Sequence, residues 1–395
     1  MTEQYQNILK QILGKGDVQY EPRTQEYILG ISASQSTYDL RNGFPLLTTK
    51  QVNPRLPAEE LFWKLRGERN VKSLVDRNVN IWTANAFDRY LKINGLKDKI
   101  SKHSQEWNEE FVKYSNRIKE DPKFAESAGD LGPVYGFQWR HWGFGNDLSE
   151  FSTTLQNTLG INLFERIPEL NGNEALFNKK EIDQLSRTLK SIKERPGSRY
   201  HVLSAWNVAD LEKMALGPCP FWHQFSVFGN KFLDLTVGQR SNDIYLGVPF
   251  NLFQDSLLTS LVAKETGLQP RYFNHQTMNT HAYLGVPPRA NFWMNEENVK
   301  EFQGQFNEIA DRQEYLDLKE WYVKNTPKES EGNERKDHIP FILEQLSKES
   351  KPLPMVRLKE NIPFMEAINL PALEVFSVDE EYQPHKWDSK ATMAS

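Results

Sequence analysis

Cys219 is the only cysteine in this chain of 395 residues. A single thiol cannot form a disulfide within the chain, so this residue is either a small apolar side chain or a nucleophile. Pro218 and Pro220 flank it, and proline fixes φ and removes a backbone donor, so the thiol is carried by a stiff backbone. The residues that follow favour the nucleophile.

Five polar side chains fall within the 13 positions from 239 to 251, namely Gln239, Arg240, Ser241, Asp243 and Asn251. A surface loop could have this composition, but the strands expected before it and the apolar helix expected after it favour a site. An arginine near a cysteine favours the thiolate, and its guanidinium also matches the oxygens of a phosphate. Both uses fit a nucleotide enzyme that works through a covalent intermediate.

Three segments carry a resemblance: Met214-Ala-Leu-Gly-Pro-Cys219, Gln239-Arg-Ser-Asn-Asp-Ile-Tyr-Leu-Gly-Val-Pro-Phe-Asn251 and Thr280-His-Ala-Tyr283. They resemble the signatures of the thymidylate synthase family, which includes the deoxynucleotide hydroxymethylases of phages. The match continues in order along nearly the whole chain.

The resemblance implies a fold of the α/β class, with a large mixed or antiparallel sheet and helices packed over it. It implies one catalytic domain over residues 1–395. Three insertions are expected in this domain, at about 93–128, 143–180 and 285–348.

The resemblance also implies a reaction. The thiolate of Cys219 adds to C6 of the pyrimidine of dUMP, and C5 then takes a one-carbon unit from 5,10-methylenetetrahydrofolate. Proton transfers in such a sequence need positioned acids, bases or waters. The residues implied as catalytic are Cys219, Glu60, Tyr135, Asn251 and Asp243.

Binding roles follow from the matched positions. Those implied for dUMP are Arg23, Arg199, Gln239, Arg240, Ser241, Asn251, His281 and Tyr283. Those implied for the folate are Lys50, Trp82, Asp243 and Gly247. Without the resemblance, Arg23 would be interpreted as a solvated arginine and Glu60 as a carboxylate turned to solvent.

Asn251 bears on the choice of base. Its amide offers one donor group and one acceptor, which match O4 and N3–H of uracil. Relatives that use cytosine have an aspartate at the matching position. A mismatch of buried donors and acceptors is heavily penalised, so Asn251 favours uracil.

The methylene formed at C5 can be reduced by hydride, giving dTMP, or captured by water, giving 5-hydroxymethyl-dUMP. A synthase must exclude water there. The chain departs from the family's synthases at Asn85, Pro220, Gly238, Asp255 and Ser395. Fewer aromatic walls and an added carboxylate would admit and orient water. We therefore expect a deoxyuridylate hydroxymethylase. A divergent thymidylate synthase is the alternative, and a non-catalytic nucleotide- or RNA-binding member is a second one.

The phosphate site also departs from the family. The family has two consecutive arginines that reach across a dimer interface to the phosphate, and this chain has Arg199 followed by Tyr200. The resemblance therefore implies a homodimer with Arg199 donated by the partner. Either phosphate binding is weaker, or His201 or another cation replaces the second arginine.

These residues need elements to hold them in place. Apolar spacing predicts helices, alternation predicts strands, and Gly229-Asn230 predicts a tight turn between two strands. The expected helices are 2–14, 57–67, 182–193 and 251–266, the expected strands are 27–31, 200–206 and the two halves of 222–237, and 328–337 is an expected exposed loop.

Composition narrows the class of protein. The net charge is −5, which argues against nucleic acid or membrane as a bulk electrostatic partner. No run of about 18 apolar residues and no signal-peptide core occur, so we expect a cytoplasmic protein, in the host cytoplasm if a phage encodes it. The eight histidines have no metal-ligand spacing, so no metal is expected.

Overall fold

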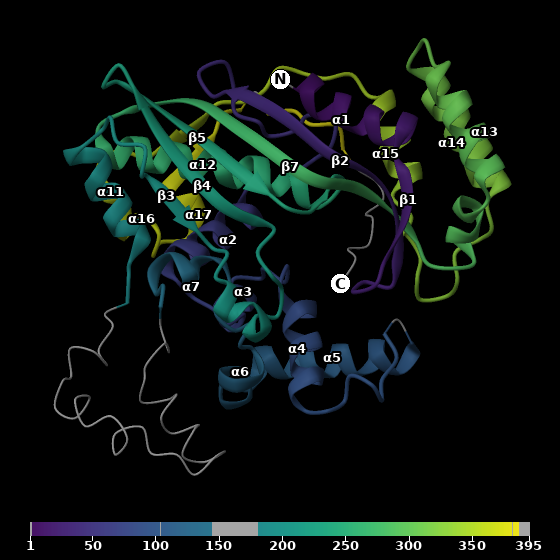
Figure 1. Cartoon of the computed structure of the whole chain (residues 1–395), viewed down its shortest axis with the longest axis horizontal. Helices are drawn as coiled ribbons and strands as arrows, with labels where there is room; N and C mark the ends of the chain where they lie inside the picture. The colour runs from purple at the N-terminus through teal and green to yellow at the C-terminus, as the bar shows by residue number, and fades with distance from the viewer. Residues whose placement is uncertain (1, 103, 144–180, 381, 387–395) are drawn as a thin grey trace, which may run out of the picture.

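The computed structural model describes residues 2–102, 104–143, 181–380 and 382–386. A seven-stranded sheet runs through it in the order β1-β2-β7-β5-β4-β3, with the short β6 paired to β7 (Figure 1). The strands are β1 (Asp17–Glu21), β2 (Glu26–Asp39), β3 (Val202–Ser204), β4 (Pro220–Phe228), β5 (Phe232–Gln239), β6 (Asn242–Asp243) and β7 (Gln269–Gly285). β5 and β6 run parallel to β7, whereas the other pairs are antiparallel. The sheet is therefore mixed, as expected.

Several helices join the sheet in its main hydrophobic core, and α1 (Thr2–Lys15) and α12 (Gly247–Thr266) pack directly on its strands. α1 packs on β2, and α12 packs on β5 and β7. The helix predicted over 2–14 is thus confirmed. α12 begins four residues before the predicted start at 251, because Pro249 lies in the first turn, where its missing N–H costs no helical hydrogen bond. It ends at Gly267, whose φ of 70° suits glycine.

The hairpin of β4 and β5 brings the chemical residues together. Its turn is Gly229-Asn230, with φ of 62° and 50°, and both values lie in the left-handed region that these residue types tolerate. The register pairs Pro220 at the start of β4 with Gln239 at the end of β5. The N–H of Arg240 donates to the carbonyl of Cys219 at 2.9 Å. The predicted hairpin is therefore confirmed, and it places Cys219 beside the polar segment.

A second hydrophobic cluster lies below the sheet in Figure 1. The helices around it are α2 (Arg55–Arg66), α3 (Lys72–Val75), α4 (Thr83–Ile93), α5 (Gln105–Glu120), α6 (Pro122–Ala128) and α7 (Tyr135–Arg140). α5 and α6 occupy the range of the first expected insertion. Ser104 and Asp121 cap these two helices by accepting from Trp107 N and Phe124 N.

The range of the third expected insertion is mainly helical. It contains η3 (Arg289–Met294), α13 (Glu296–Asn307), α14 (Gln313–Asn325) and α15 (Ile339–Ser347). α13 packs on α1, and α14 packs on α15. The remaining elements are α11 (Gln184–Glu194), η2 (Val208–Lys213), α16 (Phe364–Ala367), α17 (Ala372–Val375) and the two-stranded sheet of β8 (Val356–Leu358) and β9 (Phe376–Val378).

Two sequence expectations need correction. The segment 328–337 was expected to be exposed, yet Lys336 and Asp337 at its end are buried, because they form ion pairs with Glu26 and Arg289. The strand expected over 200–206 is limited to β3, because only its three residues pair with β4. The second expected insertion, except for residue 143, and the C-terminal residues from 387 lie outside the described residues.

Candidate active site

A cavity of about 180 Å³ lies where the hairpin, β7 and α12 meet α2 and α7. Its lining comes from segments far apart in the chain. Most of the predicted site residues line it: Arg23, Glu60, Trp82, Tyr135, Cys219, Gln239, Ser241, Asp243, Gly247, Asn251, His281 and Tyr283. An adjoining cavity of about 240 Å³ shares Arg23 and Cys219 with it and adds Arg240.

Arg240 provides the positive charge next to the thiol. Its Nη2 lies 3.8 Å from Sγ of Cys219. The guanidinium is held in place by the carbonyls of Gly217 at 2.6 Å and Pro218 at 3.0 Å. Because the guanidinium is fixed by backbone contacts, its charge lies beside the sulfur of Cys219 in the geometry seen here.

Tyr135 contacts the backbone of the nucleophile. Its hydroxyl accepts a hydrogen bond from the backbone N–H of Cys219 at 2.9 Å. Burial raises the pKa of Tyr135, and the nearby charges of Cys219 and Glu60 raise it further. The phenol therefore keeps its proton and can donate it to a second partner in the cavity.

Asn251 is oriented by Gln239, which is itself oriented by His275. Gln239 donates from Nε2 to Oδ1 of Asn251 at 3.1 Å, and its Oε1 accepts from Nε2 of His275 at 2.9 Å. Burial lowers the pKa of His275 to about 4, so the imidazole is neutral. The Nε2–H of this ring fixes which way the amide of Gln239 faces. His275 was missed by sequence reasoning, because nothing in its local pattern distinguishes it from a core histidine.

Glu60 accepts two hydrogen bonds and forms an ion pair. Trp82 Nε1 and Lys64 Nζ each lie 2.9 Å from its Oε1, and Gln254 Nε2 lies 2.6 Å from its Oε2. Glu60 therefore lines the cavity and is not turned to solvent. Lys64 and Gln254 were also missed. Lys64 follows Glu60 by four positions on a predicted helix, a spacing that places both on one face and could have identified the pair.

His281 and Asp243 lie on adjacent strands. Nδ1 of His281 donates to the carbonyl of Asn279 at 2.9 Å, and burial lowers the pKa of the ring, so its Nε2 is free to accept from a hydroxyl. Oδ1 of Asp243 accepts from the N–H groups of Tyr245 and Leu246, each at 3.0 Å. These contacts leave the second carboxylate oxygen for a ligand.

Two predicted residues do not line either cavity. Lys50 is buried, with Nζ donating to the carbonyl of Tyr245 at 2.5 Å and lying 3.5 Å from the centre of that ring. Arg199 is exposed, as is Tyr200 at 90%. His201 is fully buried outside both linings, so within this chain it does not supply the missing cation.

The positions expected to admit water fall into two groups. Asn85 and Pro220 line the cavity. Gly238 does not, and a side chain there would run into the indole of Trp222. Asp255 does not either, because it lies in the core with Oδ1 3.1 Å from Nε2 of His223. The expectation that these two positions wet the cavity is therefore wrong.

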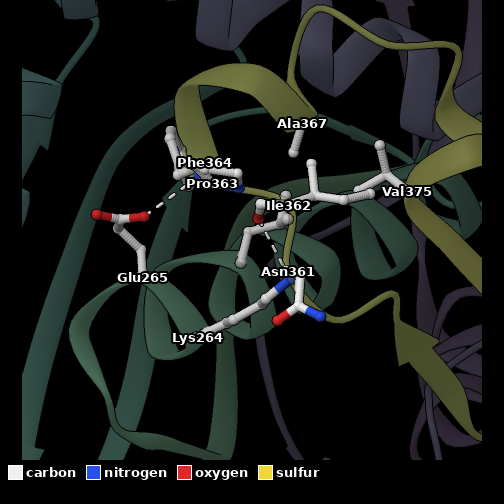
Figure 2. A pocket seen from close by; sticks show the side chains of 9 residues that line it. Lys264, Glu265, Asn361, Ile362, Pro363, Phe364, Ala367 and Val375 are labelled. Atoms are coloured by element: carbon white, nitrogen blue, oxygen red, sulfur yellow. Dashed lines mark hydrogen bonds between the residues drawn. The ribbon is translucent and has the colours of Figure 1, made fainter.

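A larger cavity of about 280 Å³ lies between α12 and α16 (Figure 2). Its two charged residues already have partners. Lys264 donates to the carbonyls of Lys359 and Ile362, and Glu265 accepts from the N–H of Phe364 at 3.3 Å. This cavity contains no nucleophile, so the chemistry belongs to the cavity at Cys219.

Among the residues that the structure describes, no group of three or more His, Cys, Asp or Glu side chains could hold a metal ion. None of the described helices is long and apolar enough to cross a membrane.

Comparison with known proteins gives a consistent result. The family model described as thymidylate synthase matches residues 3–395. The thymidylate synthase of Mycoplasma genitalium is 37% identical over 281 residues, which cover 71% of this chain and 81% of the relative. That of Mesoplasma florum is 36% identical over 282 residues with the same coverage. That of Listeria monocytogenes serotype 4b is 35% identical over 292 residues, covering 71% and 82%.

Proposed function

The chain belongs to the thymidylate synthase family, and we propose that it converts dUMP and methylenetetrahydrofolate into dTMP and dihydrofolate. The observation that carries this proposal is the cavity in which Cys219 faces Asn251, with Arg240 beside the thiol. The product dTMP is the one expected of a divergent thymidylate synthase, the first alternative of the sequence analysis. It replaces 5-hydroxymethyl-dUMP as the main expectation.

In the first step, Cys219 acts as the nucleophile. Its sulfur forms a bond to C6, and the electron pair of the C5=C6 bond moves towards O4. Arg240, whose guanidinium lies beside the thiol, also has the planar group that suits the 5′-phosphate, together with Arg23 and Ser241 at the adjoining cavity.

Asn251 recognises the base. Oδ1 of Asn251 accepts from Gln239, which leaves Nδ2 free to donate to O4 of uracil. Oδ1 has a second lone pair and can also accept from N3–H of the base. The donation to O4 strengthens as negative charge develops there, so it assists the addition of Cys219 as well as the choice of base.

The second substrate fits the wall opposite the base. Ile81, Trp82, Leu246 and Phe250 provide an apolar surface for a flat ring, and Asp243 can accept hydrogen bonds at its edge. When bound there, the folate supplies the one-carbon unit and the hydride. Lys50 is proposed to contact the tail of the folate, although in the unliganded chain Nζ of Lys50 lies against Tyr245.

The fate of the methylene depends on water. Because Asp255 lies outside the cavity and is paired to His223, it cannot orient a water at the methylene, and reduction is favoured. Capture by water is the second candidate, supported by Asn85 and Pro220, which line the cavity where the family's synthases have larger or different side chains.

Product analysis tests the proposal. Purified enzyme is incubated with dUMP and methylenetetrahydrofolate, and the products are identified by mass spectrometry while dihydrofolate is followed by absorbance. We expect equimolar dTMP and dihydrofolate, and none from the Cys219→Ser variant, since a hydroxyl is a far weaker nucleophile at neutral pH. 5-Hydroxymethyl-dUMP with tetrahydrofolate would support the second candidate. Absence of any release of tritium from C5-labelled dUMP would leave only a binding protein.

We also propose that the protein works as a homodimer. Arg199 and Tyr200 are exposed at the edge of the sheet, away from the cavity of their own chain. Val202, Phe228 and Met278 share one face of the sheet in the observed register and are all more than a third exposed. An exposed apolar face of this kind suits a second copy of the chain, which would bring Arg199 to the partner's phosphate site.

A further inference from the structure

Lys64 is a cationic residue in the wall of the active site. It extends from α2, is 4% exposed, and lines the same cavity as Cys219. Its Nζ lies 2.9 Å from Oε1 of Glu60, 3.0 Å from Oε1 of Gln254 and 4.9 Å from the ring centre of Tyr135. A lysine buried to this degree is uncommon unless its charge is balanced.

The contacts of Lys64 form a closed triangle. Lys64 forms an ion pair with Glu60 and donates a hydrogen bond to Gln254. Gln254 in turn donates to the second oxygen of Glu60 at 2.6 Å. The amide of Gln254 can satisfy both charged neighbours in only one orientation, with its oxygen towards the ammonium. The triangle therefore holds the Glu60 carboxylate in one place and gives it a counter-charge.

We propose that Lys64 is a positioning residue for the reaction, which balances the charge of Glu60 while negative charge grows on the pyrimidine. When Cys219 adds to C6, the displaced electron pair is shared between C5 and O4, and no proton moves in this step. An uncompensated carboxylate in the same poorly solvated cavity would oppose that charge. The inference rests on the proposed function but not on the fate of the methylene.

A purely structural role for Lys64 makes a different prediction. Buried ion pairs contribute little to stability on average, and their replacement by apolar residues is often neutral. If the triangle only packs α2 against α12, then removing the ammonium changes the stability and leaves the rate and its pH dependence as they were.

The test uses Lys64→Met, which removes the charge and roughly keeps the volume. Release of tritium from C5-labelled dUMP measures turnover whichever product forms. We expect kcat to fall by about 10²-fold, the magnitude seen when one transition-state donor is lost, while KM for dUMP changes by less than about threefold. Lys319→Met is the matched control, because Lys319 forms a part-buried ion pair with Glu344 at 2.7 Å between α14 and α15, outside the cavity, and its kcat should stay near that of wild type.

The pH profile separates positioning from packing. In Lys64→Met, Glu60 becomes a buried carboxylate without its counter-charge, and taking up a proton relieves this. The acid limb of kcat should therefore move to higher pH by roughly one unit or more. The other titratable groups that line this cavity are Arg23, Tyr135, Cys219, Asp243, His281 and Tyr283. They are unchanged in the variant, and Gln254 from α12 carries no charge.

A second variant covers the case in which Lys64→Met does not fold. Lys64→Ala with added ethylamine should recover kcat in a saturable way, because the amine can occupy the space of the ammonium. A folded variant with kcat within twofold of wild type and an unshifted acid limb, or an alanine variant that no amine rescues, would overturn the proposal. Wild-type enzyme that releases no tritium would contradict the proposed function itself, and this is measured before any variant.

Discussion

At the scale of single residues, the polar groups of the cavity are held in place by contacts with neighbouring buried side chains. His275 orients Gln239, which orients Asn251, and Lys64 with Gln254 orients Glu60. Each chain of hydrogen bonds ends in a buried group with only one usable protonation state or rotamer. The site is therefore preorganised before substrate binds, which is the condition for electrostatic catalysis.

The choice of base can be tested at Asn251. Asn251→Asp replaces the Nδ2 donor by an acceptor, which matches the amino group of cytosine and opposes O4 of uracil. We expect the ratio of dUMP to dCMP turnover to fall by at least roughly 10²-fold. Asn274→Asp, on β7 and outside the lining of the cavity, is the control. An unchanged ratio in Asn251→Asp would show that Asn251 does not recognise the base.

Lys50 should make stability depend on pH. Burial lowers its pKa from 10.5 to about 7, against the opposing effect of Asp243. Between about pH 7 and 10 the unfolded chain keeps a proton that the folded chain has lost, so the free energy of unfolding rises with pH in this window. Below about pH 6 both states are protonated, and this contribution is constant.

Comparison with Lys50→Met isolates the effect. Urea unfolding followed by circular dichroism should give a difference in unfolding free energy, wild type minus variant, that grows by roughly 3 kcal/mol from pH 7 to pH 10. Lys193→Met, in a half-exposed pair with Glu265, should show no such growth. Parallel curves for wild type and Lys50→Met would mean that Lys50 remains charged in the folded protein.

At the scale of elements, the hairpin and α12 are joined by a buried hydrogen bond. His223 on β4 and Asp255 on α12 are 3.1 Å apart, and both are almost fully buried. Nδ1 of His223 and Oδ2 of Asp255 have no hydrogen-bond partner, so the pair is sustained by its single contact. Removing one partner leaves a buried polar group with nothing to balance it.

A double-mutant cycle measures this coupling. His223→Phe should lower the unfolding free energy by about 1–3 kcal/mol, because Asp255 is left as a buried polar group without its partner. The double variant His223→Phe/Asp255→Leu should return to within about 1 kcal/mol of wild type. It should also leave the product unchanged, since Asp255 is not in the cavity. A shift from dTMP to 5-hydroxymethyl-dUMP, or the reverse, would show that Asp255 controls water after all.

The sequence predicted elements better than contacts between them. The hairpin turn at Gly229-Asn230 and the apolar face of α1 are local patterns, and both are observed. The contact between Lys64 and Gln254 joins residues 190 positions apart, and no local pattern encodes it. Membership of Glu60 and His281 in the site was implied only by resemblance, since burial of a polar side chain depends on tertiary packing.

At the scale of the whole molecule, the first and third predicted insertions both contact the β1–β2 hairpin, whose loop carries Arg23. Lys102, from the first, lies 3.4 Å from the carbonyl of Arg23. Lys336, from the third, forms a buried ion pair with Glu26 at 3.3 Å. Both segments therefore brace the β1–β2 hairpin at the phosphate end of the site, while the exposed sheet face remains for a second copy.

Mixing two inactive variants tests the proposed dimer. Arg199→Ala should lack a phosphate contact, and Cys219→Ser should lack the nucleophile. If Arg199 acts on the partner's site, a mixed dimer has one site with both defects and one intact site. After random subunit exchange of equal amounts, about a quarter of wild-type activity should return. No recovery, despite subunit exchange shown by mass spectrometry, would place Arg199 outside the partner's site.

The presence of a single cysteine also makes the enzyme countable. Since Cys219 is the only thiol and is partly exposed at the cavity, a thiol-specific label reports on active sites and on nothing else in the chain. Misfolded chains carry the same thiol, so the moles of label whose incorporation saturating dUMP prevents equal the moles of sites that bind dUMP. Turnover numbers can thus be expressed per dUMP-binding site, without correction for other reactive thiols.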